Sequence, residues 1–290
     1  MSGSPLQVGD ALRWATRLLV TAGVDAPRLD AELLLGHVLG CDRAQLPSRW
    51  SAALPEAAAA CYTALIRRRA AREPTAYLLG MRPFYDVTLE VTPAVLVPRP
   101  ETEHLVEAAL AWLQRRAHPR PRIVDVGAGS GAIAIVLARH LPDAQMLAID
   151  LSAEALQVAR RNIARLGLAG RIALLQADLL TALDGAFDLI AANLPYVDHD
   201  ELPTLMPEVS RYEPALALDG GSGGLAIVER LLAMLPERLA PGGLALLELD
   251  PRQMARATAL ALAALPAATV GAIGDYAGQA RVLTVEREAG

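Results

Sequence analysis

Apolar residues recur every three or four positions through the first 72 residues of the chain. They form three groups separated by proline, glycine and aspartate. The groups are Leu12, Ala15, Leu18 and Leu19, then Leu29, Leu33, Leu34 and Val38, then Ala58, Tyr62, Leu65 and Ile66. This spacing is typical of amphipathic helices that bury one face. We therefore expect an N-terminal helical bundle that forms a small domain over residues 1–80.

The pattern changes between Phe84 and Val97. Two short β-prone runs, 86–91 and 95–97, are separated by Thr92 and a proline. This predicts a β-hairpin linker over residues 81–100. Residues 98–100, Pro-Arg-Pro, then end the extended run, and Glu101-Thr102-Glu103 predicts the start of a helix because acidic residues suit the positive end of a helix dipole.

After Pro121 short apolar runs alternate with helical patterns. The predicted strands are 123–126, 146–149, 172–175, 187–192 and 244–249, with a closing pair at 269–273 and 281–285, and the predicted helices begin at Ser130, Ser152 and near Leu225, with a further helix ending near Leu265. Strands that are apolar throughout are typical of parallel sheets covered on both faces. The alternation predicts an α/β domain with a Rossmann-like, doubly wound sheet over residues 101–290.

Composition excludes some classes of enzyme and argues against some partners. All 27 basic residues are arginine, so the chain lacks the lysine that a P-loop or a Schiff-base enzyme requires. A formal net charge of −5 argues against bare nucleic acid as the main partner. Cys41 and Cys61 have no CxxC spacing, which favours buried free thiols. No signal peptide or membrane span is evident, so we expect a cytoplasmic protein.

A glycine-rich segment follows the first strand of the predicted sheet. It reads Asp125-Val126-Gly127-Ala128-Gly129-Ser130-Gly131-Ala132. Glycines at such a strand-to-helix turn let backbone N–H groups approach a ligand without an intervening side chain. The spacing fits the G-x-G-x-x-G/A of dinucleotide-binding proteins and equally the G-x-G-x-G of S-adenosyl-L-methionine (SAM) enzymes. The residues alone leave these two cofactors open.

Two aspartates follow the next two strands. Asp150 ends the second strand, where a carboxylate can accept the hydroxyl groups of a ribose, and Ser152 is the better candidate for the helix N-cap. Asp178, with Leu179, follows the third strand at the same edge of the sheet and is placed to face an adenine amino group. A plain loop aspartate is an equally good interpretation of Asp178.

The segment Asn193-Leu194-Pro195-Tyr196 directly follows the strand 187–192. A conjugated nitrogen attacks a methyl group only when acceptors hold its N–H bonds and direct its lone pair. Asn193 offers a side-chain carbonyl, and Leu194 offers a backbone carbonyl that the following proline keeps extended. Tyr196 offers a flat face against which an amide can lie. The sequence fingerprint of NAD-binding proteins does not include a segment of this kind.

With these motifs the chain resembles the PrmC/HemK family of SAM-dependent methyltransferases over nearly its whole length. The marks of the resemblance are Val97-Pro98-Arg99-Pro100-Glu101-Thr102-Glu103, the Asp125–Gly131 loop, Asp150, Asn193–Tyr196 and Arg211-Tyr212-Glu213-Pro214. The resemblance implies a seven-stranded SAM fold behind a helical domain that helps to grip a peptide chain release factor. It also implies methylation of the N5 side-chain amide nitrogen of a glutamine in that release factor.

The resemblance further assigns the site residues. The residues expected to bind SAM are Gly127, Ala128, Gly129, Ser130, Gly131, Asp150, Asp178, Leu179 and Asn193, and those expected to bind the glutamine and act in catalysis are Asn193, Leu194, Pro195 and Tyr196, with Phe84 lining the glutamine pocket. The family usually has Asn-Pro-Pro-Tyr, so Leu194 is a departure that frees φ at this position. A monomer without a membrane or direct nucleic-acid partner is expected.

Other functions remain open. The Asn-Leu-Pro-Tyr form is also similar to the motif of ribosomal RNA adenine dimethylases, so a ribosomal protein glutamine or an RNA adenine amino group is an alternative acceptor. An NAD-dependent oxidoreductase is a more distant alternative. His199 has acidic neighbours, but adjacent loop positions rarely converge on one ion, so we expect no metal site.

Overall fold

The computed structural model describes residues 6–116, 119–275 and 277–289. The chain divides into two compact units. The first comprises Met1–Met81 together with Met206–Tyr212, and the second comprises Arg82–Leu205 and Glu213–Gly290. Within the described ranges, no helix is long and apolar enough to cross a lipid bilayer.

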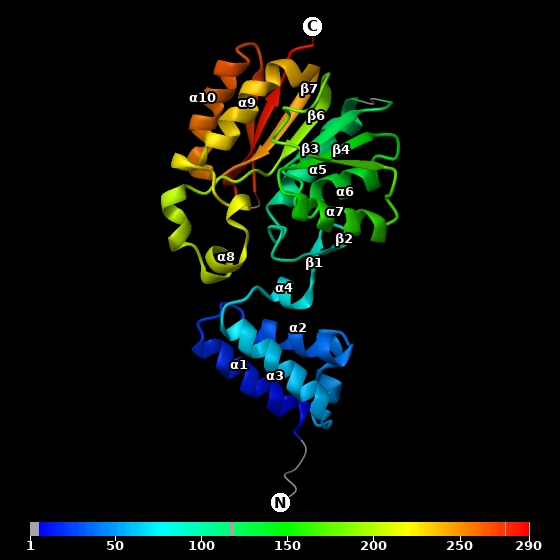
Figure 1. The fold of residues 1–290 in the computed structure, drawn as a ribbon, viewed down its shortest axis with the longest axis vertical. Helices are drawn as coiled ribbons and strands as arrows, with labels where there is room; N and C mark the ends of the chain where they lie inside the picture. The colour runs from blue at the N-terminus through cyan, green and yellow to red at the C-terminus, as the bar shows by residue number, and fades with distance from the viewer. Residues whose placement is uncertain (1–5, 117–118, 276, 290) are drawn as a thin grey trace, which may run out of the picture. The chain divides into compact units, whose positions relative to one another are not determined.

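The first unit is helical, as the apolar spacing predicted (Figure 1). Its helices are α1 (Val8–Thr21), α2 (Pro27–Leu39), α3 (Glu56–Ala70), α4 (Thr75–Leu79) and α8 (Pro207–Tyr212). Proline opens α2, where its missing N–H needs no partner, and Gly40 ends it in the left-handed conformation at φ 59°. The side chains buried between the helices include Leu12, Leu35 and Ile66, each fully covered.

Charged side chains join α8 to the rest of this unit. Arg69 of α3 is 6% exposed and forms ion pairs with Asp30 at 2.7 Å and with Glu208 at 2.8 Å. Arg72 contacts the same glutamate at 2.6 Å. The buried Arg69 and the partly buried Arg72 therefore hold a segment that lies far along the sequence.

A seven-stranded sheet forms the centre of the second unit. The strands are β3 (Arg122–Val126), β4 (Gln145–Asp150), β5 (Ile172–Gln176), β6 (Phe187–Ala192), β7 (Leu239–Glu248), β8 (Thr269–Gly274) and β9 (Ala280–Glu286). Their order is β5-β4-β3-β6-β7-β9-β8. The first five are parallel, whereas β9 runs antiparallel to β7 and β8. This is the α/β, Rossmann-like sheet that the alternating pattern predicted.

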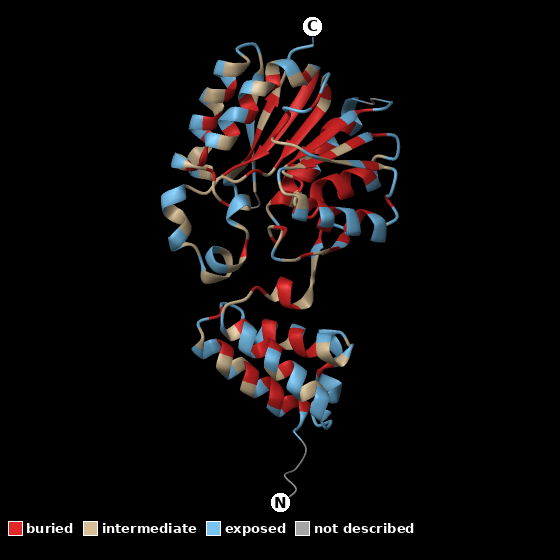
Figure 2. Ribbon diagram, in the orientation of Figure 1, coloured by how far each residue is buried: buried red, intermediate tan, exposed pale blue. Residues whose placement is uncertain are grey.

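Helices cover both faces of this sheet, with α9 and α10 on one face and α5, α6 and α7 on the other (Figure 1). Their bounds are α5 (Thr102–Arg116), α6 (Ala132–His140), α7 (Ala153–Arg165), α9 (Ala226–Arg238) and α10 (Met254–Ala264). Neighbouring strand residues alternate between the two cores: Leu189 packs in one, and Ile190 packs in the other. The central strands β3, β6 and β7 therefore read as continuous apolar runs and are buried almost throughout (Figure 2), whereas the edge strands β5 and β8 are mostly partly buried or exposed.

The structure differs from the expected boundaries in two places. The hairpin, β1 (Met81–Phe84) and β2 (Val87–Glu90), clusters almost entirely with the sheet unit rather than forming a separate linker, and residues 95–97 form no strand. Residues 206–212 cluster with the helical unit.

The two thiols are free, but Cys61 is exposed and Cys41 is only partly covered, contrary to the expectation that both are buried.

Candidate active site

The register of three neighbouring strands brings three sequence motifs to one edge of the sheet. Val126 of β3 pairs with Ile149 of β4 on one side and with Ala192 of β6 on the other. The residue that follows each of these is Gly127, Asp150 or Asn193. Strand order reverses between β3 and β6, and ligands bind at such a switch point in open α/β sheets.

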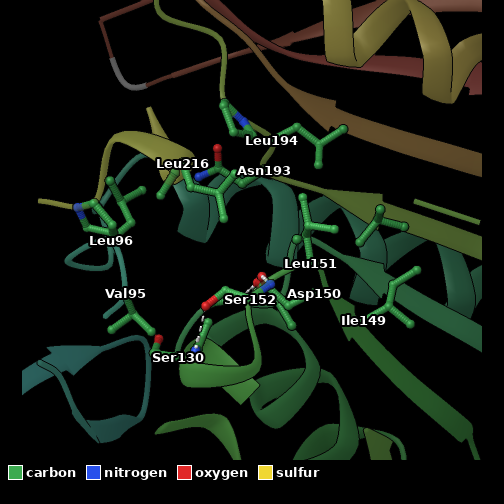
Figure 3. A pocket seen from close by; sticks show the side chains of 18 of the residues that line it. Val95, Leu96, Ser130, Ile149, Asp150, Leu151, Ser152, Asn193, Leu194 and Leu216 are labelled. Carbon is green, nitrogen blue, oxygen red and sulfur yellow. Dashed lines mark hydrogen bonds between the residues drawn. The ribbon is translucent and has the colours of Figure 1, made fainter. Parts of the chain in front are cut away.

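A cavity of about 180 Å³ lies at this edge (Figure 3). Its walls include most of the predicted cofactor and substrate residues, namely Gly127, Ala128, Gly129, Ser130, Asp150, Asp178, Leu179, Asn193, Leu194 and Pro195. Asn193 and Leu194 lie on one side of the pocket, and Ser130 and Asp150 lie on the other (Figure 3). The cavity therefore joins the glycine loop and the Asn193 segment in one site.

The glycine loop depends on backbone conformations that other residues rarely adopt. Gly127, Gly129 and Gly131 have φ values of 78°, 54° and 83°. A Cβ at Gly129 would meet no atom within 4 Å, so its backbone faces open space in the cavity wall. The open backbone is that of Gly129, whereas Leu194 lies over Gly127, and Gly131 lies beside Ile135 and is not among the residues that line the cavity.

Asp150 connects the second strand with this loop. Its Oδ2 accepts a hydrogen bond from the Gly129 N–H, and its Oδ1 accepts one from the Ser152 N–H, both at 2.8 Å. Ser152 caps α7 by accepting the Ala155 N–H, as expected. Burial raises the pKa of Asp150. Each of its oxygens still has a lone pair for a further donor, as recognition of a ribose requires.

Asp178 and Leu179 lie on the far wall, after β5. Asp178 forms an ion pair with Arg230 of α9 at 2.6 Å, although both side chains are about half exposed. Leu179 has a positive φ of 52° and is buried. Both residues line the cavity, which fits a flat, partly apolar group with exocyclic nitrogen at this end.

Asn193 faces the cavity from the end of β6. Its Nδ2 donates to Oγ1 of Thr102 at 2.9 Å. Within the described ranges no hydrogen bond engages its Oδ1, so this oxygen is available to a donor in the cavity. The next residue, Leu194, is 5% exposed, and its Cδ2 would lie 3.1 Å from a Cβ at Gly127. The leucine side chain therefore packs directly on the glycine loop.

Two expected substrate residues are not among those that line the cavity. Phe84 is 2% exposed and packs in the core beside α5 and α6, so it is a core residue here. The Tyr196 ring packs against the core on the α9 side, its hydroxyl lies 3.4 Å from Glu248 Oε1, and its backbone carbonyl accepts the Gln253 amide at 2.7 Å. These contacts fix the position of Tyr196 beside the cavity.

Asp125 is also absent from the cavity. It is fully buried, and its Oδ2 accepts the Ala134 N–H of α6 at 3.0 Å. Burial raises its pKa to about 7. Its role in the glycine motif is to hold the first turn of the helix that follows.

Sequence reasoning missed several supporting residues. Asn162 of α7 is completely buried and donates to the carbonyls of Ser130 and Glu90, at 3.0 and 2.9 Å. Arg99 pairs with Glu213 at 2.7 Å. The stretch that contains Arg99 and the segment 211–214 were recognised as family marks, but no local signal predicts that they meet. His199, considered earlier for a metal, instead pairs with Asp219 at 2.8 Å.

Sequence comparisons with known proteins match both units of the chain to methyltransferase families. Residues 10–80 match the family described as PrmC N-terminal domain, and residues 123–212 match a methyltransferase domain. The chain is 39% identical to the release factor glutamine methyltransferase of Rhodopirellula baltica, covering 98% of this chain and 97% of that protein. It is 43% identical to that of Moorella thermoacetica, covering 96% and 97%.

Solved structures of methyltransferases share the fold. The catalytic domain of hMettl16, in complex with a MAT2A 3′UTR hairpin, aligns with a TM-score of 0.56 at 17% identity, covering 78% of this chain and 82% of that one. The Thermus thermophilus 16S rRNA methyltransferase RsmC, in complex with AdoMet and guanosine, aligns with a TM-score of 0.53 at 19% identity, covering 72% and 50%. With its N-terminal match and its full-length relatives, this chain belongs to the release factor glutamine methyltransferase family.

Proposed function

We propose that this protein transfers a methyl group from SAM to the side-chain amide nitrogen of a glutamine in a peptide chain release factor. The observation that carries the proposal is the position of Asn193. It stands at the edge of a glycine-lined cavity with its Nδ2 already engaged and its Oδ1 available. An acceptor in this place suits an N–H of a carboxamide.

The residues present fit SAM. Gly129 has open backbone in the cavity wall that would face the methionine portion, and the two oxygens of Asp150 have remaining lone pairs for the ribose hydroxyls. Asp178 and Leu179 would hold the adenine. When bound, SAM supplies an electrophilic methyl group on a sulfonium.

The residues of this chain then have a positioning task. An amide nitrogen is a weak nucleophile because its lone pair is conjugated with the carbonyl. The Asn193 Oδ1 and the Leu194 carbonyl accept its two N–H bonds, which directs the lone pair toward the methyl group. Pro195 restricts the Leu194 backbone, and the Leu194 side chain is packed on Gly127. Alignment of reactants can lower a barrier by about 7–11 kcal/mol. The methylated nitrogen is strongly acidic and loses its extra proton to water, so no metal or strong base is required.

The helical unit is proposed to grip the release factor. Its match to the PrmC N-terminal domain supports this role. On α2 the large apolar side chains of Leu29 and Leu33 lie one helical turn apart, 39% and 36% exposed, and are available for contact. Because its substrate is a translation protein, we propose that the enzyme acts in the cytoplasm. Residues of a single chain line the cavity, and we propose that it acts as a monomer.

The decisive experiment compares methyl acceptors. Purified protein is incubated with radiolabelled SAM and a release factor, a ribosomal protein or ribosomal RNA, and the modified residue is located by mass spectrometry. We expect labelling of one release factor glutamine. Preferential labelling of RNA or of the ribosomal protein would overturn the proposal, as would thermal stabilisation by NADH in preference to SAM.

The Asn193→Ala variant, measured in the same assay, tests the role given to Asn193. Loss of one positioned hydrogen-bonding group should lower turnover by about a hundredfold or more. Most of the thermal stabilisation by SAM should persist, because Asn193 is the only one of the expected SAM-binding residues that changes, and the glycine loop and Asp150 are unaltered. Undiminished turnover would refute the role given to Asn193.

A further inference from the structure

The wall of the cavity carries basic side chains from two different segments. Among the described residues that line it, the basic ones are Arg99 and Arg230. Arg230 of α9 forms an ion pair with Asp178, which follows β5. Arg99 belongs instead to the stretch that leads into α5.

Hydrogen bonds place Arg99 near the end of β6. Its backbone carbonyl accepts the Thr102 N–H at 3.2 Å, so the two residues are the ends of one tight turn. The Thr102 hydroxyl oxygen in turn accepts the Asn193 Nδ2 at 2.9 Å. Residues 95–96, from the same stretch, lie on the side of the pocket away from Ile149 of β4 (Figure 3). Arg99 therefore belongs to the β6 end of the site.

This end lies well away from the Arg230 pair. The sheet order places β4 and β3 between β5 and β6, which amounts to three strand spacings of about 4.8 Å each. The two cations thus serve opposite ends of the cavity.

The guanidinium of Arg99 has donors to spare. Its Nη2 donates to Oε1 of Glu213 at 2.7 Å, and no hydrogen bond within the described ranges engages its Nε or Nη1. A guanidinium has five N–H donors in a rigid plane. The Arg99 side chain is 30% exposed and lines the cavity, whereas that of Glu213 is 2% exposed. Glu213 therefore anchors one arm of the guanidinium and leaves the others for a ligand.

The proposed placement of SAM gives each strand end a different part of the ligand. Adenine lies with Asp178 after β5, and the ribose lies with Asp150 at the end of β4. Because β3 and β6 come next in the sheet, the methionine portion extends toward Arg99. This portion carries the carboxylate, which is the one negatively charged group of SAM.

We propose that Arg99 binds the methionine carboxylate of SAM, with Glu213 fixing its guanidinium, and that this contact makes the site select ligands that have the carboxylate. The inference rests on the proposed function, which supplies the direction of SAM in the cavity. The planar fork of a guanidinium matches a carboxylate with two parallel hydrogen bonds. Arg99 is thus a cofactor-binding residue, and the methyl group is transferred elsewhere in the site.

Binding of two ligands tests the proposal without any methyl transfer. S-adenosylhomocysteine, the product that SAM leaves behind, keeps the carboxylate, and its decarboxylated analogue lacks only this group. Calorimetry at about 0.15 M salt, which screens long-range charge effects, gives both Kd values. The unaltered protein should bind S-adenosylhomocysteine at least about tenfold more tightly than the analogue. In Arg99→Met the two Kd values should agree within about threefold.

Arg230→Met is the matched control, because it removes the other basic side chain of the cavity wall. It should keep the preference for the carboxylate at about tenfold or more, since Arg230 belongs to the adenine end. Loss of the preference in both variants alike would assign it to the general charge of the cavity and overturn the proposal.

A second variant guards against damage to the fold. Arg99→Met leaves the buried Glu213 without its cation, so the measurement is repeated in Arg99→Met/Glu213→Gln, which has no unpaired charge. This double variant should also bind the two ligands alike. Glu213→Gln alone keeps the Arg99 charge and should keep most of the preference. A full preference in the double variant would overturn the proposal.

These readouts separate the proposed function from the role of Arg99. If the unaltered protein binds neither ligand, the assignment of the cavity to SAM fails, and the role of Arg99 fails with it. If the preference for the carboxylate depends on Arg99 but no release factor is methylated, only the proposed substrate is wrong. If Arg99→Met keeps the preference and raises only the KM for the release factor, Arg99 serves the protein substrate and this inference is wrong.

Discussion

The guanidinium of Arg99 lies 2.7 Å from Oε1 of Glu213, whose side chain is only 2% exposed. Burial raises the pKa of Glu213, and the Arg99 charge opposes this rise. The pair joins the Pro-Arg-Pro stretch before α5 to the segment that follows α8, and both residues adjoin the cavity wall. Two motifs that mark the family thus meet as one ion pair.

Arg99→Ala should destabilise the sheet unit by about 2–3 kcal/mol, because it leaves a buried carboxylate unpaired. Adding Glu213→Gln should recover at least half of the loss. Arg161→Ala, which breaks the exposed pair with Glu90, should change stability by less than about 1 kcal/mol. Urea unfolding followed by Trp112 fluorescence, with Trp14 and Trp50 replaced by Phe, reports this unit. Equal losses in Arg99→Ala and Arg161→Ala would contradict the prediction.

Leu194 and Gly127 form a second testable contact. Gly127→Ala places a Cβ 3.1 Å from Leu194 Cδ2 and imposes a φ of 78° on a residue with a side chain. We expect weaker SAM binding and lower stability. Leu194→Ala in the same chain should recover part of the stability, because only the contact is relieved and the backbone strain remains. A double-mutant cycle without coupling between the two positions would show that the leucine does not press on the loop.

The parts of the site that the sequence predicted are those encoded within a few residues of a strand end. Gly127, Asp150 and Asn193 each directly follow an apolar run, and parallel strands deliver such positions to one edge. The contacts behind them join distant segments. Thr102 and Asn193 are separated by 91 positions, and Arg99 and Glu213 by 114. No periodicity or local propensity encodes such a pairing.

The pattern of apolar and polar residues also could not predict which way a side chain points or which unit a short segment joins. Phe84 ends a strand of the hairpin, where either face is compatible with its sequence, and the structure turns it into the core. No sequence signal assigned segment 206–212 to the helical unit, and its place there depends on Arg69 and Arg72. Tertiary contacts decided both cases.

Two neighbouring glycines provide a matched test of the Tyr196 segment. Gly223 and Gly224 have nearly the same φ, 69° and 70°. A Cβ at Gly224 would lie 2.2 Å from the Tyr196 carbonyl oxygen, whereas one at Gly223 would approach only the flexible end of Arg256, at 3.1 Å. Alanine adds backbone strain of about 1–2 kcal/mol at either position. Gly224→Ala alone must also displace the segment 193–196.

We therefore expect Gly224→Ala to lower methyl transfer at least about tenfold and Gly223→Ala to retain most of it. Methyl incorporation and thermal unfolding of both variants measure the difference. Similar activity in the two proteins would mean that the Tyr196 backbone tolerates displacement.

Asp125 should give the sheet unit a characteristic pH dependence. Burial raises its pKa to about 7, and the nearby charge of Asp150 adds to the rise. In the unfolded chain an aspartate has a pKa of about 3.9. Between about pH 4 and pH 7 the folded protein therefore binds the proton that the unfolded chain has lost. The free energy of unfolding falls as the pH rises through this window, by at most about 1.4 kcal/mol per pH unit from this group, and levels above it.

Asp125→Asn removes the charge and keeps an oxygen for the Ala134 N–H, so it should remove this contribution. Relative to the unaltered protein, the variant should become progressively more stable from pH 5 to pH 8. Asp150, Glu213 and Glu248, whose pKa values burial also raises, are present in both proteins, and their contributions largely cancel in the difference. Urea unfolding followed by Trp112 fluorescence at each pH measures the difference in the free energy of unfolding between the two proteins. Parallel stability profiles would show that Asp125 is ionised in its buried position, with Ala134 and the first turn of α6 stabilising the charge.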